Sequence, residues 1–193
     1  MSAFHDEPWT RLDEHMPLLI AIRHENLFDE PAEQEWNEED SALRRAVRAV
    51  LLDDSGKMAL MHAAKDRYHK LPGGGVEEGE DAETALRREL REETGAEIEI
   101  ESAIGRTAEY IANYGLKQFS YAYSARLVGR PGETSFTDEE EAGGFGVSWI
   151  EPREALELME SERPQSYSGH FIRRRDLSIL RAFLEGAASA DGR

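Results

Sequence analysis

The sequence contains no cysteine. This absence excludes disulfide bonds, thiolate metal sites and cysteine nucleophiles together, so any metal must be held by oxygen atoms or by imidazole. Long apolar runs are missing as well. The longest apolar run near the N-terminus, Leu18 to Ile22, is far too short to cross a bilayer. We therefore expect no association with membranes and, where metal chemistry occurs, carboxylate or histidine ligands.

Positive charge is scarce, because 23 lysines and arginines stand against 40 aspartates and glutamates and the formal net charge is -17. Contacts from lysine and arginine to phosphates supply most nonspecific affinity for nucleic acids, so this composition disfavours a nucleic-acid partner. Small phosphorylated ligands remain compatible, since a divalent cation can bridge carboxylates to phosphates. The N-terminus, Met1 to Asp6, has no basic segment followed by an apolar one, so we expect no secretory signal and a cytoplasmic location.

The chain of 193 residues is long enough for one domain with an appended arm. Residues 1–40 are acidic and contain three prolines that interrupt any long helix, so we expect an arm with one strand there and a single domain over 41–193. A partly disordered acidic leader is the alternative for the arm. Leu18 to Ile22 is an apolar strip within this acidic segment, and we expect it to be covered by the domain or by a second subunit of a homodimer.

The spacing of apolar, turn and capping residues predicts the remaining elements. Two apolar runs flank the turn residues Asp53 to Gly56, which indicates a hairpin over 46–52 and 58–62. Leu71-Pro72-Gly73-Gly74-Gly75 must be an irregular loop, because proline lacks a donor and glycine carries maximal backbone freedom. Asp81 as N-cap and Gly95 as C-cap bound a helix over 82–94. We also predict strands over 96–100, 118–128 and 147–150, and helices over 152–159 and 171–184, within one α/β domain.

Three glutamates share one face of the predicted helix over 82–94. At about 100° per residue, Glu89, Glu92 and Glu93 fall within about 100° of arc. Like charges this close require a cation, and carboxylate oxygens suit Mg²⁺ or Mn²⁺. A divalent ion there can polarise a phosphorus centre and lower the pKa of an attacking water, which favours phosphoanhydride hydrolysis. For an isolated E-x-x-E-E pattern, the alternative is a solvated helix face.

The glutamates belong to a longer motif whose residues stand at fixed offsets: Gly74, Glu80, Arg88, Glu89, Leu90, Glu92, Glu93, Gly95 and Ala96. These residues resemble the Nudix box of the MutT-like Nudix hydrolase family, G-x5-E-x7-R-E-U-x-E-E-x-G-U, where U is aliphatic and Ala96 is a permissive match. Seven fixed identities would match by accident in well under about one chain in 10⁴. The resemblance therefore favours the metal-binding interpretation over the solvated helix face.

The resemblance implies an α/β/α sandwich with a mixed central sheet, in which the motif supplies a loop, a helix and a second loop. It also implies a hydrolase that uses Mg²⁺, with Mn²⁺ as the other candidate. The reaction would cleave the phosphoanhydride bond of a nucleoside diphosphate linked to another group. The partner would then be a small nucleotide substrate.

The motif assigns expected roles to its residues. The expected metal ligands are the carboxylates of Glu89, Glu92 and Glu93. A backbone group of Gly73 is expected to be a further ligand. Because like charges repel, replacing Glu93 by glutamine is expected to leave stability without metal unchanged or slightly higher. Arg88 lies one turn before Glu92 and is expected to hold that carboxylate in place. The residues expected to shape the loops are Gly74, Glu80 and Gly95.

Residues outside the motif are expected to complete the site. Family members often use a further acid from a later loop as general base or metal ligand, and the run over 138–141 lies where one is expected. We favour Glu140 or Glu141, with a solvated acidic loop as the alternative. The expected substrate contacts are two arginines for phosphate and two tyrosines for a base, with core packing as the alternative for the tyrosines: Arg48, Arg67, Tyr68 and Tyr121. The basic run over 173–175 is expected on the polar side of the last helix.

The type of nucleotide is left open by the sequence. The branch of the family that hydrolyses ADP-ribose typically carries a proline beyond the motif, where this chain has Tyr110 and Ile111. A tyrosine somewhat further on is associated with hydrolases of diadenosine polyphosphates, and Tyr114 lies near that place. Nucleoside triphosphates and nucleotide sugars are the other candidates. The rival function is a regulator that senses a nucleotide without turnover, and the intact carboxylate triad argues against it.

Overall fold

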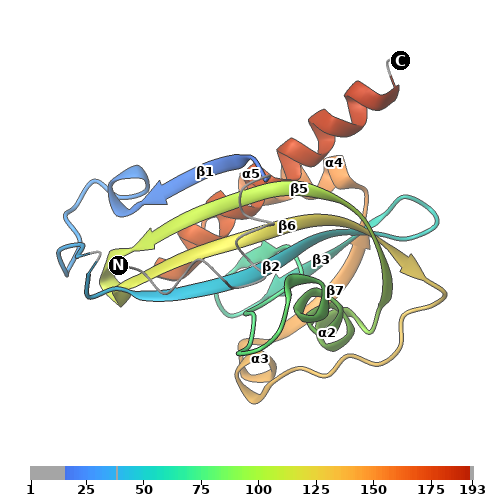
Figure 1. The fold of residues 1–193 in the computed structure, drawn as a ribbon, viewed down its shortest axis with the longest axis horizontal. Coiled ribbons are helices and arrows are strands. Elements are labelled where there is room, and N and C mark those ends of the chain that lie inside the picture. The colour runs from blue at the N-terminus through green and yellow to red at the C-terminus, as the bar shows by residue number, and fades with distance from the viewer. Residues whose placement is uncertain (1–15, 38, 192–193) are drawn as a thin grey trace.

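The computed structural model of the protein describes residues 16–37 and 39–191. The elements in chain order are β1 (Leu18–Arg23), η1 (His24–Asn26), β2 (Ala42–Leu52), β3 (Met58–Ala63), β4 (Tyr68–Lys70), α2 (Ala82–Thr94), β5 (Glu97–Ile111), η2 (Ala112–Tyr114), β6 (Leu116–Val128), α3 (Asp138–Gly143), β7 (Phe145–Ile150), α4 (Pro152–Ser161) and α5 (Tyr167–Asp191) (Figure 1). The helix predicted over 82–94 has the observed bounds of α2. Each of these helices is too short or too polar to cross a bilayer.

Seven strands form one mixed sheet in the order β1-β5-β6-β2-β3-β4, and β7 pairs with β3 outside this path. β1 runs parallel to β5, and β2 runs parallel to β6. The other pairs are antiparallel. The mixed central sheet expected from the sequence is therefore present.

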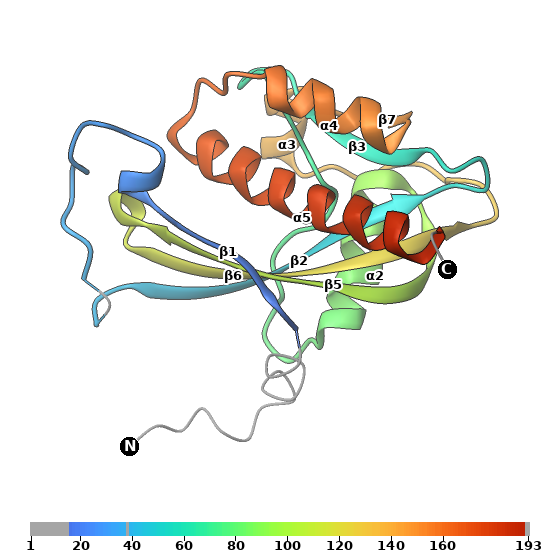
Figure 2. The ribbon, with the colours of Figure 1, turned by 90° about the horizontal axis from the view of Figure 1, so that it is seen from above.

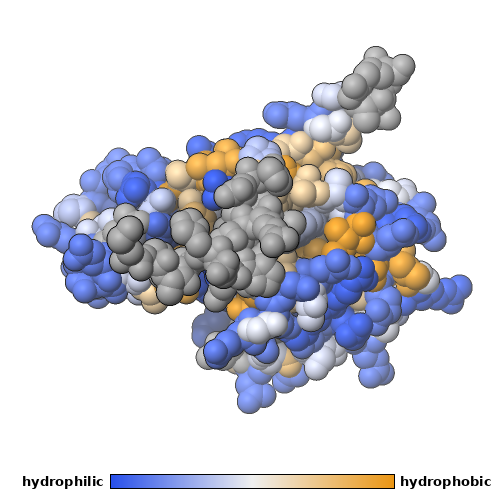
Figure 3. Space-filling model, viewed as in Figure 1, coloured by the Kyte–Doolittle hydropathy of each residue, from blue (hydrophilic) through white to orange (hydrophobic). Residues whose placement is uncertain are grey.

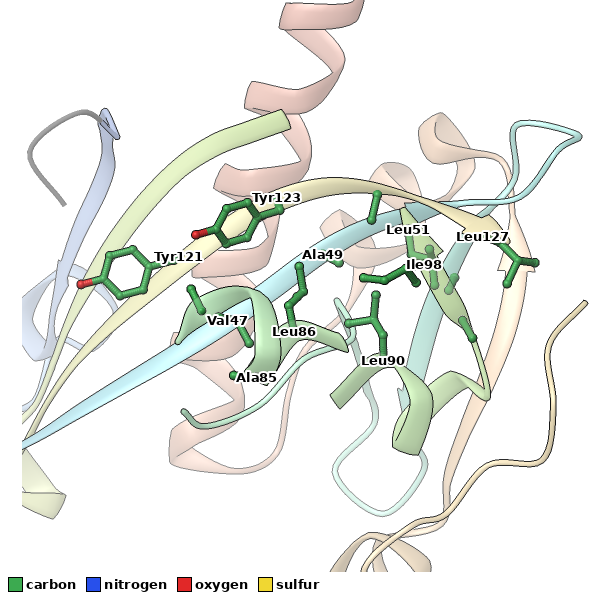
Figure 4. Close-up of a cluster of buried hydrophobic side chains, with 14 of the residues drawn as sticks. Val47, Ala49, Leu51, Ala85, Leu86, Leu90, Ile98, Tyr121, Tyr123 and Leu127 are labelled. Carbon is green, nitrogen blue, oxygen red and sulfur yellow. The ribbon is translucent and has the colours of Figure 1, made fainter. Parts of the chain in front are cut away.

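Helices cover both faces of the sheet, with α2 on one side and α4 and α5 on the other (Figure 2). Alternate residues of β2 point to opposite faces, so Ala49 packs with Leu86 and Leu90 of α2 (Figure 4). Its neighbour Val50 packs in a second cluster with Met159 of α4 and residues of α5. This arrangement is the α/β/α sandwich, and it confirms the predicted fold class.

The predicted hairpin forms only at its turn. Leu52 pairs with Met58, and the two strands then diverge. β3 pairs along its length with β7, and β4 takes the other edge of β3. The glycine loop runs along the edge of β2 that β3 leaves, because the backbone nitrogen of Val47 donates to the Gly74 carbonyl at 2.9 Å. The split between β2 and β3 thus places the loop beside α2.

The strand of the N-terminal arm is built into the sheet. β1 lies against β5, and Ile22 is fully buried beside Ile111 and Phe171. Leu18, at the start of the strip, is 51% exposed. Residues 1–15 of the expected arm lie outside the described residues. Hydrophilic side chains cover most of the face shown in Figure 3, in keeping with the acidic composition.

Candidate active site

Both ends of α2 are fixed by residues that the sequence identifies. The Asp81 side chain accepts a hydrogen bond from the Thr84 backbone nitrogen at 2.8 Å, and Gly95 ends the helix in the left-handed region with φ 67°. A Cβ at Gly95 would lie 2.3 Å from the Gly132 carbonyl oxygen, so the connection after β6 packs directly on this end of the helix. The capping residues therefore set the position of the carboxylates on the last two turns.

Close packing explains two glycines of the loop between β4 and α2. Gly73 has φ 128°, and a Cβ there would lie 2.2 Å from the Val47 carbonyl oxygen. A Cβ at Gly74 would lie 2.2 Å from Oε2 of Glu89. The loop thus fits between β2 and α2 only because these residues lack side chains.

Glu93 joins the loop to the helix. Its Oε2 accepts a hydrogen bond from the Gly73 backbone nitrogen at 2.6 Å, and its Oε1 pairs with Nζ of Lys70 at 2.8 Å. The residue is only 2% exposed. Glu93 is therefore a satisfied buried carboxylate, and its contacts argue against the expectation that replacement by glutamine leaves stability unchanged, because the replacement would leave part-buried Lys70 without its counter-charge.

Arg88 binds the other acidic residues of the motif. Its guanidinium forms a bidentate ion pair with Glu80, at 2.8 and 2.9 Å. It also contacts Glu89 at 2.9 Å and Glu92 at 3.2 Å. It also donates to the Gly75 carbonyl at 3.0 Å. The hydrogen bonds that Arg88 donates to the Glu80 carboxylate are the main reason that the pKa of Arg88 is raised. Glu80 therefore lies beside Arg88 and away from the cleft lining, while Glu89 and Glu92 face the cleft.

Glu89 is the carboxyl whose proton affinity is raised by its surroundings. Burial raises its pKa above the ordinary value; Arg88 opposes this effect, and the neighbouring Glu93 adds to it. No three His, Asp or Glu side chains within the described ranges converge as metal ligands do. In this structure Arg88 contacts Glu89 and Glu92, and Lys70 contacts Glu93.

A cleft of about 770 Å³ brings the loop, α2 and the sheet together. The sequence-predicted site residues that line it are Arg48, Tyr68, Gly73, Gly74, Arg88, Glu89, Glu92 and Glu93. The residues that line it without having been predicted are Arg44, Lys70, Gly75, Glu77, Ser135, Phe136, Thr137, Phe145, Ile172 and Arg175. Carboxylates of α2 thus face cations of β2, β4 and α5 across one cavity.

Three of the residues expected to bind substrate or take part in catalysis lie elsewhere. Arg67 is exposed in the turn between β3 and β4, with φ 55°, so its side chain does not reach the cleft. Tyr121 is 2% exposed within the core between the sheet and α2 (Figure 4). Side chains alternate along β6, and Tyr121 and Tyr123 point to the face of the sheet that α2 covers. Glu141 is exposed on α3, and the cleft is lined instead by the segment 135–137 just before that helix. Nothing is known of the Glu140 side chain, which falls outside the described part of the chain.

The basic run at the start of α5 is also corrected. Arg175 is 1% exposed instead of lying on the polar side of the helix. It pairs with Asp176 at 2.6 Å and with Glu109 of β5 at 3.6 Å. Burial alone would lower the pKa of Arg175, but these two carboxylates together raise it. Asp176 also accepts a hydrogen bond from the Leu71 backbone nitrogen at 2.9 Å, which ties α5 to the glycine loop.

Two further residues of the cleft have shifted proton affinities. Burial, together with repulsion from Arg175, lowers the pKa of Arg48 to about 10, so the charged form is less stable than in water. Burial raises the pKa of the Tyr68 hydroxyl to about 12, which keeps it neutral and able to donate a hydrogen bond at physiological pH. The cleft is therefore a site where desolvation strengthens charge interactions.

Comparison with known proteins relates this chain to one protein family. The model of the NUDIX domain matches residues 42–170. An RNA pyrophosphohydrolase of Dinoroseobacter shibae is 37% identical over 70 residues, which cover 35% of this chain and 44% of that protein. An RNA pyrophosphohydrolase of Caulobacter vibrioides is 35% identical over 136 residues, which cover 60% of this chain and 76% of that protein. The chain thus spans less than half of the first relative and about three quarters of the second.

Solved structures agree with the fold. A NUDIX hydrolase from Nitrosomonas europaea superposes with a TM-score of 0.57 at 20% identity, covering 75% of this chain and 90% of that one. The match to the family model includes the glycine loop, all of α2 and the strands around the cleft. On this sequence match and this architecture, the chain belongs to the NUDIX domain family.

Proposed function

We propose that the protein is a divalent-metal-dependent hydrolase that cleaves a phosphoanhydride bond in a nucleoside diphosphate linked to another group. The observation that carries this proposal is the cleft itself, in which Glu89, Glu92 and Glu93 lie opposite Arg48 and Lys70. Membership of the NUDIX family supports the same reaction class. Such a cleft can hold phosphates between cationic side chains and a carboxylate face.

The donor set fits Mg²⁺ or Mn²⁺. Burial raises the pKa of Glu89 above its ordinary value, and the negative charge of neighbouring Glu93 raises it further, so the two carboxylates lie close enough to repel each other. A divalent ion would relieve this repulsion, and oxygen ligands are the ones these ions prefer. When bound, the ion supplies polarisation of a phosphoryl oxygen and a lowered pKa for an attacking water. Glu89, Glu92 and Glu93 would hold it once the Arg88 guanidinium withdraws from two of them.

The protein's own residues then divide the work. Glu89 is the preferred general base among the three carboxylates, because its raised pKa suits proton uptake from water; Glu92 and Glu93 would remain as ligands at that step. Glu141 does not line the cleft. Glu80 keeps Arg88 on the motif side of the cleft through its two-pronged contact. Glu93 fixes the loop through Gly73. Lys70 and Arg48 would bind phosphate oxygens that the carboxylates repel.

A substrate panel tests the proposal. The chain is incubated with Mg²⁺ and a nucleoside triphosphate, a dinucleoside tetraphosphate, ADP-ribose, a nucleotide sugar or an RNA with a 5′-triphosphate, and products are identified by mass. We expect release of a nucleoside monophosphate or pyrophosphate that stops with EDTA and resumes with Mg²⁺ or Mn²⁺. Undiminished turnover in EDTA, or nucleotide binding with no turnover under any metal, would contradict the proposal.

The RNA substrate is included in the panel because of the relatives found by sequence. Two of the relatives are RNA pyrophosphohydrolases. The net charge of -17 opposes contacts with a long phosphate backbone, so we expect small nucleotides to be hydrolysed with the higher kcat/KM. Comparing a mononucleotide with an oligonucleotide that carries the same 5′ end decides between them.

A further inference from the structure

A second cavity opens beside the cleft. This annex has a volume of about 140 Å³ and lies over the face of β5, β6 and β2 that points to α5. Four residues line both the cleft and the annex: Arg44, Arg48, Ile172 and Arg175. These three arginines and one isoleucine form the boundary between the two cavities, which we call the arginine passage.

Two of these arginines, Arg44 and Arg48, form no ion pair within the described residues. Arg88 pairs with the acids at its end of α2, Lys70 pairs with Glu93, and Arg175 pairs with Asp176 and Glu109. Arg44 and Arg48 have no carboxylate partner in the described part of the chain: Arg44 donates to the Gln118 side chain at 3.0 Å, and Arg48 donates to the Val47 carbonyl at 2.6 Å.

Arg48 is the sharper case. It is 5% exposed, and its Nε has no hydrogen-bond partner. Burial and repulsion from Arg175 disfavour the charged guanidinium, and the carboxylates that oppose this effect, Asp176, Glu93 and Glu109, act without a direct ion pair to Arg48 within the described residues. An anion at the passage would satisfy its donors and reduce that repulsion.

The passage depends on a part of the chain outside the family match. The NUDIX model ends at residue 170, whereas Ile172 and Arg175 come from the part of α5 beyond it. Asp176 keeps α5 in place by accepting from the Leu71 backbone at 2.9 Å. The arginine passage therefore combines two arginines of β2, inside the matched residues, with Ile172 and Arg175 of α5 beyond them.

We propose that Arg44 and Arg48, backed by Arg175, bind a phosphate of the substrate additional to the two that share the bond to be cleaved. This inference rests on the proposed function. The carboxylates of α2 would hold the divalent ion at the diphosphate to be cleaved, and the guanidiniums of Arg44 and Arg48, which have no carboxylate in direct contact, match one further phosphate dianion. The substrate class is then a nucleotide with three or more consecutive phosphates, in preference to a diphosphate joined to an uncharged sugar.

Metal-free binding tests the passage independently of catalysis. Inorganic tripolyphosphate is titrated calorimetrically into the full chain in EDTA, using the wild type, Arg44→Met, Arg48→Met and Arg174→Met. Arg174 is the matched control, because it is the exposed neighbour of Arg175 and lines neither cavity. We expect Arg44→Met and Arg48→Met each to weaken binding about tenfold or more, as loss of a charge-assisted contact does, and Arg174→Met to bind like the wild type.

We expect Arg44→Met and Arg48→Met to fold, so that a change in binding reports on the lost guanidinium. Neither replacement leaves a carboxylate without its partner, and Arg44 lies on the exposed part of β2. Equal binding by all four proteins, or no binding of tripolyphosphate by the wild type, would overturn the inference. These outcomes are distinct from failure of the proposed function, which would appear as absent metal-dependent turnover.

Turnover supplies the second readout. The ratio of kcat/KM for a nucleoside triphosphate to kcat/KM for a nucleotide sugar is measured in Mg²⁺ for the wild type and Arg48→Met. We expect the wild type to favour the triphosphate and the ratio to fall about tenfold in the variant. A wild type that prefers the nucleotide sugar, or a ratio that the variant leaves unchanged, rejects the additional phosphate.

Discussion

The backbone nitrogen of Gly73 donates a hydrogen bond to Oε2 of Glu93 at 2.6 Å. This contact links the loop that follows β4 to the last turn of α2. Because Glu93 also pairs with Lys70, the carboxylate fixes both the loop and a cation of the cleft. Changes on either side of this contact should therefore alter loop geometry and carboxylate position together.

Replacing Gly73 by alanine should disrupt the site. A Cβ at φ 128° would lie 2.2 Å from the Val47 carbonyl oxygen, so the loop must move away from β2. We expect a loss of about 3 kcal/mol in the free energy of unfolding and most of the turnover. Gly79→Ala is the control, because Gly79 also has a positive φ, 82°, but nothing lies within 4 Å of its added Cβ. It should cost about 1 kcal/mol. Equal urea midpoints for the two variants would contradict the packing argument.

Glu80→Gln should reveal the ion pair with Arg88 through pH. Hydrogen bonds from Arg88 lower the pKa of Glu80 below its ordinary value of 4.5, so the pair stabilises the fold above that pH. The contribution is lost as the pH falls through the lowered pKa. We expect the variant to be roughly 1 kcal/mol less stable at pH 7 and to approach the wild type at pH 3. Urea unfolding at both pH values measures this, and a difference that does not change with pH would refute the assignment.

Asp176 should anchor the glycine loop from α5. Asp176→Ala removes the acceptor of the Leu71 backbone nitrogen and leaves buried Arg175 with Glu109 as its remaining counter-charge, so about 3 kcal/mol of stability should be lost. Asp176→Asn keeps an acceptor for Leu71 and should lose less. The comparison uses the urea midpoint and KM of each variant. Equally small losses in both variants would show that the contact does not anchor the loop.

The N-terminal strand should be part of the folded unit. Ile22 is fully buried beside Phe171 of α5, so Ile22→Ala should cost about 2 to 4 kcal/mol. Leu18→Ala is the matched control at the exposed end of the same strand and should change stability little. Deletion of residues 1–40 should therefore destabilise the protein. A truncated chain with unchanged melting temperature would mean that β1 is dispensable.

The sequence predicts those parts of the fold that local signals control. Asp81 and Gly95 bound α2 because capping depends on side chains within a few residues. The alternation of Phe119, Tyr121 and Tyr123 identifies a strand, but whether that face meets a substrate or a helix depends on α2, which is distant in sequence from β6. Tyr121 was for this reason assigned to the substrate and lies in the core.

Charged residues of the cleft show a second limit of sequence reasoning. Lys70 ends the three-residue strand β4, Arg44 lies near the start of β2, and neither belongs to a motif; the split between β2 and β3 brings them to the glutamates of α2. Arg175 resembles its neighbours Arg173 and Arg174 in sequence, yet it is buried because Asp176 and Glu109 provide its counter-charges. One signal was available: Arg175 and Asp176 are adjacent opposite charges among the apolar positions of the last helix.

The most direct test of the account is kcat for Glu93→Gln on the best substrate of the panel, in Mg²⁺ and in EDTA. Glutamine keeps the length of the side chain but removes the charge that would hold the ion, so kcat in Mg²⁺ should fall about 100-fold or more. Glu83→Gln on the exposed side of α2 is the control and should keep wild-type turnover. Stability should fall in Glu93→Gln because Lys70 loses its partner, so melting temperatures are recorded to confirm that both variants are folded at the assay temperature. A folded Glu93→Gln protein with near-wild-type kcat would contradict the assignment of α2 as the metal-binding face of the hydrolase.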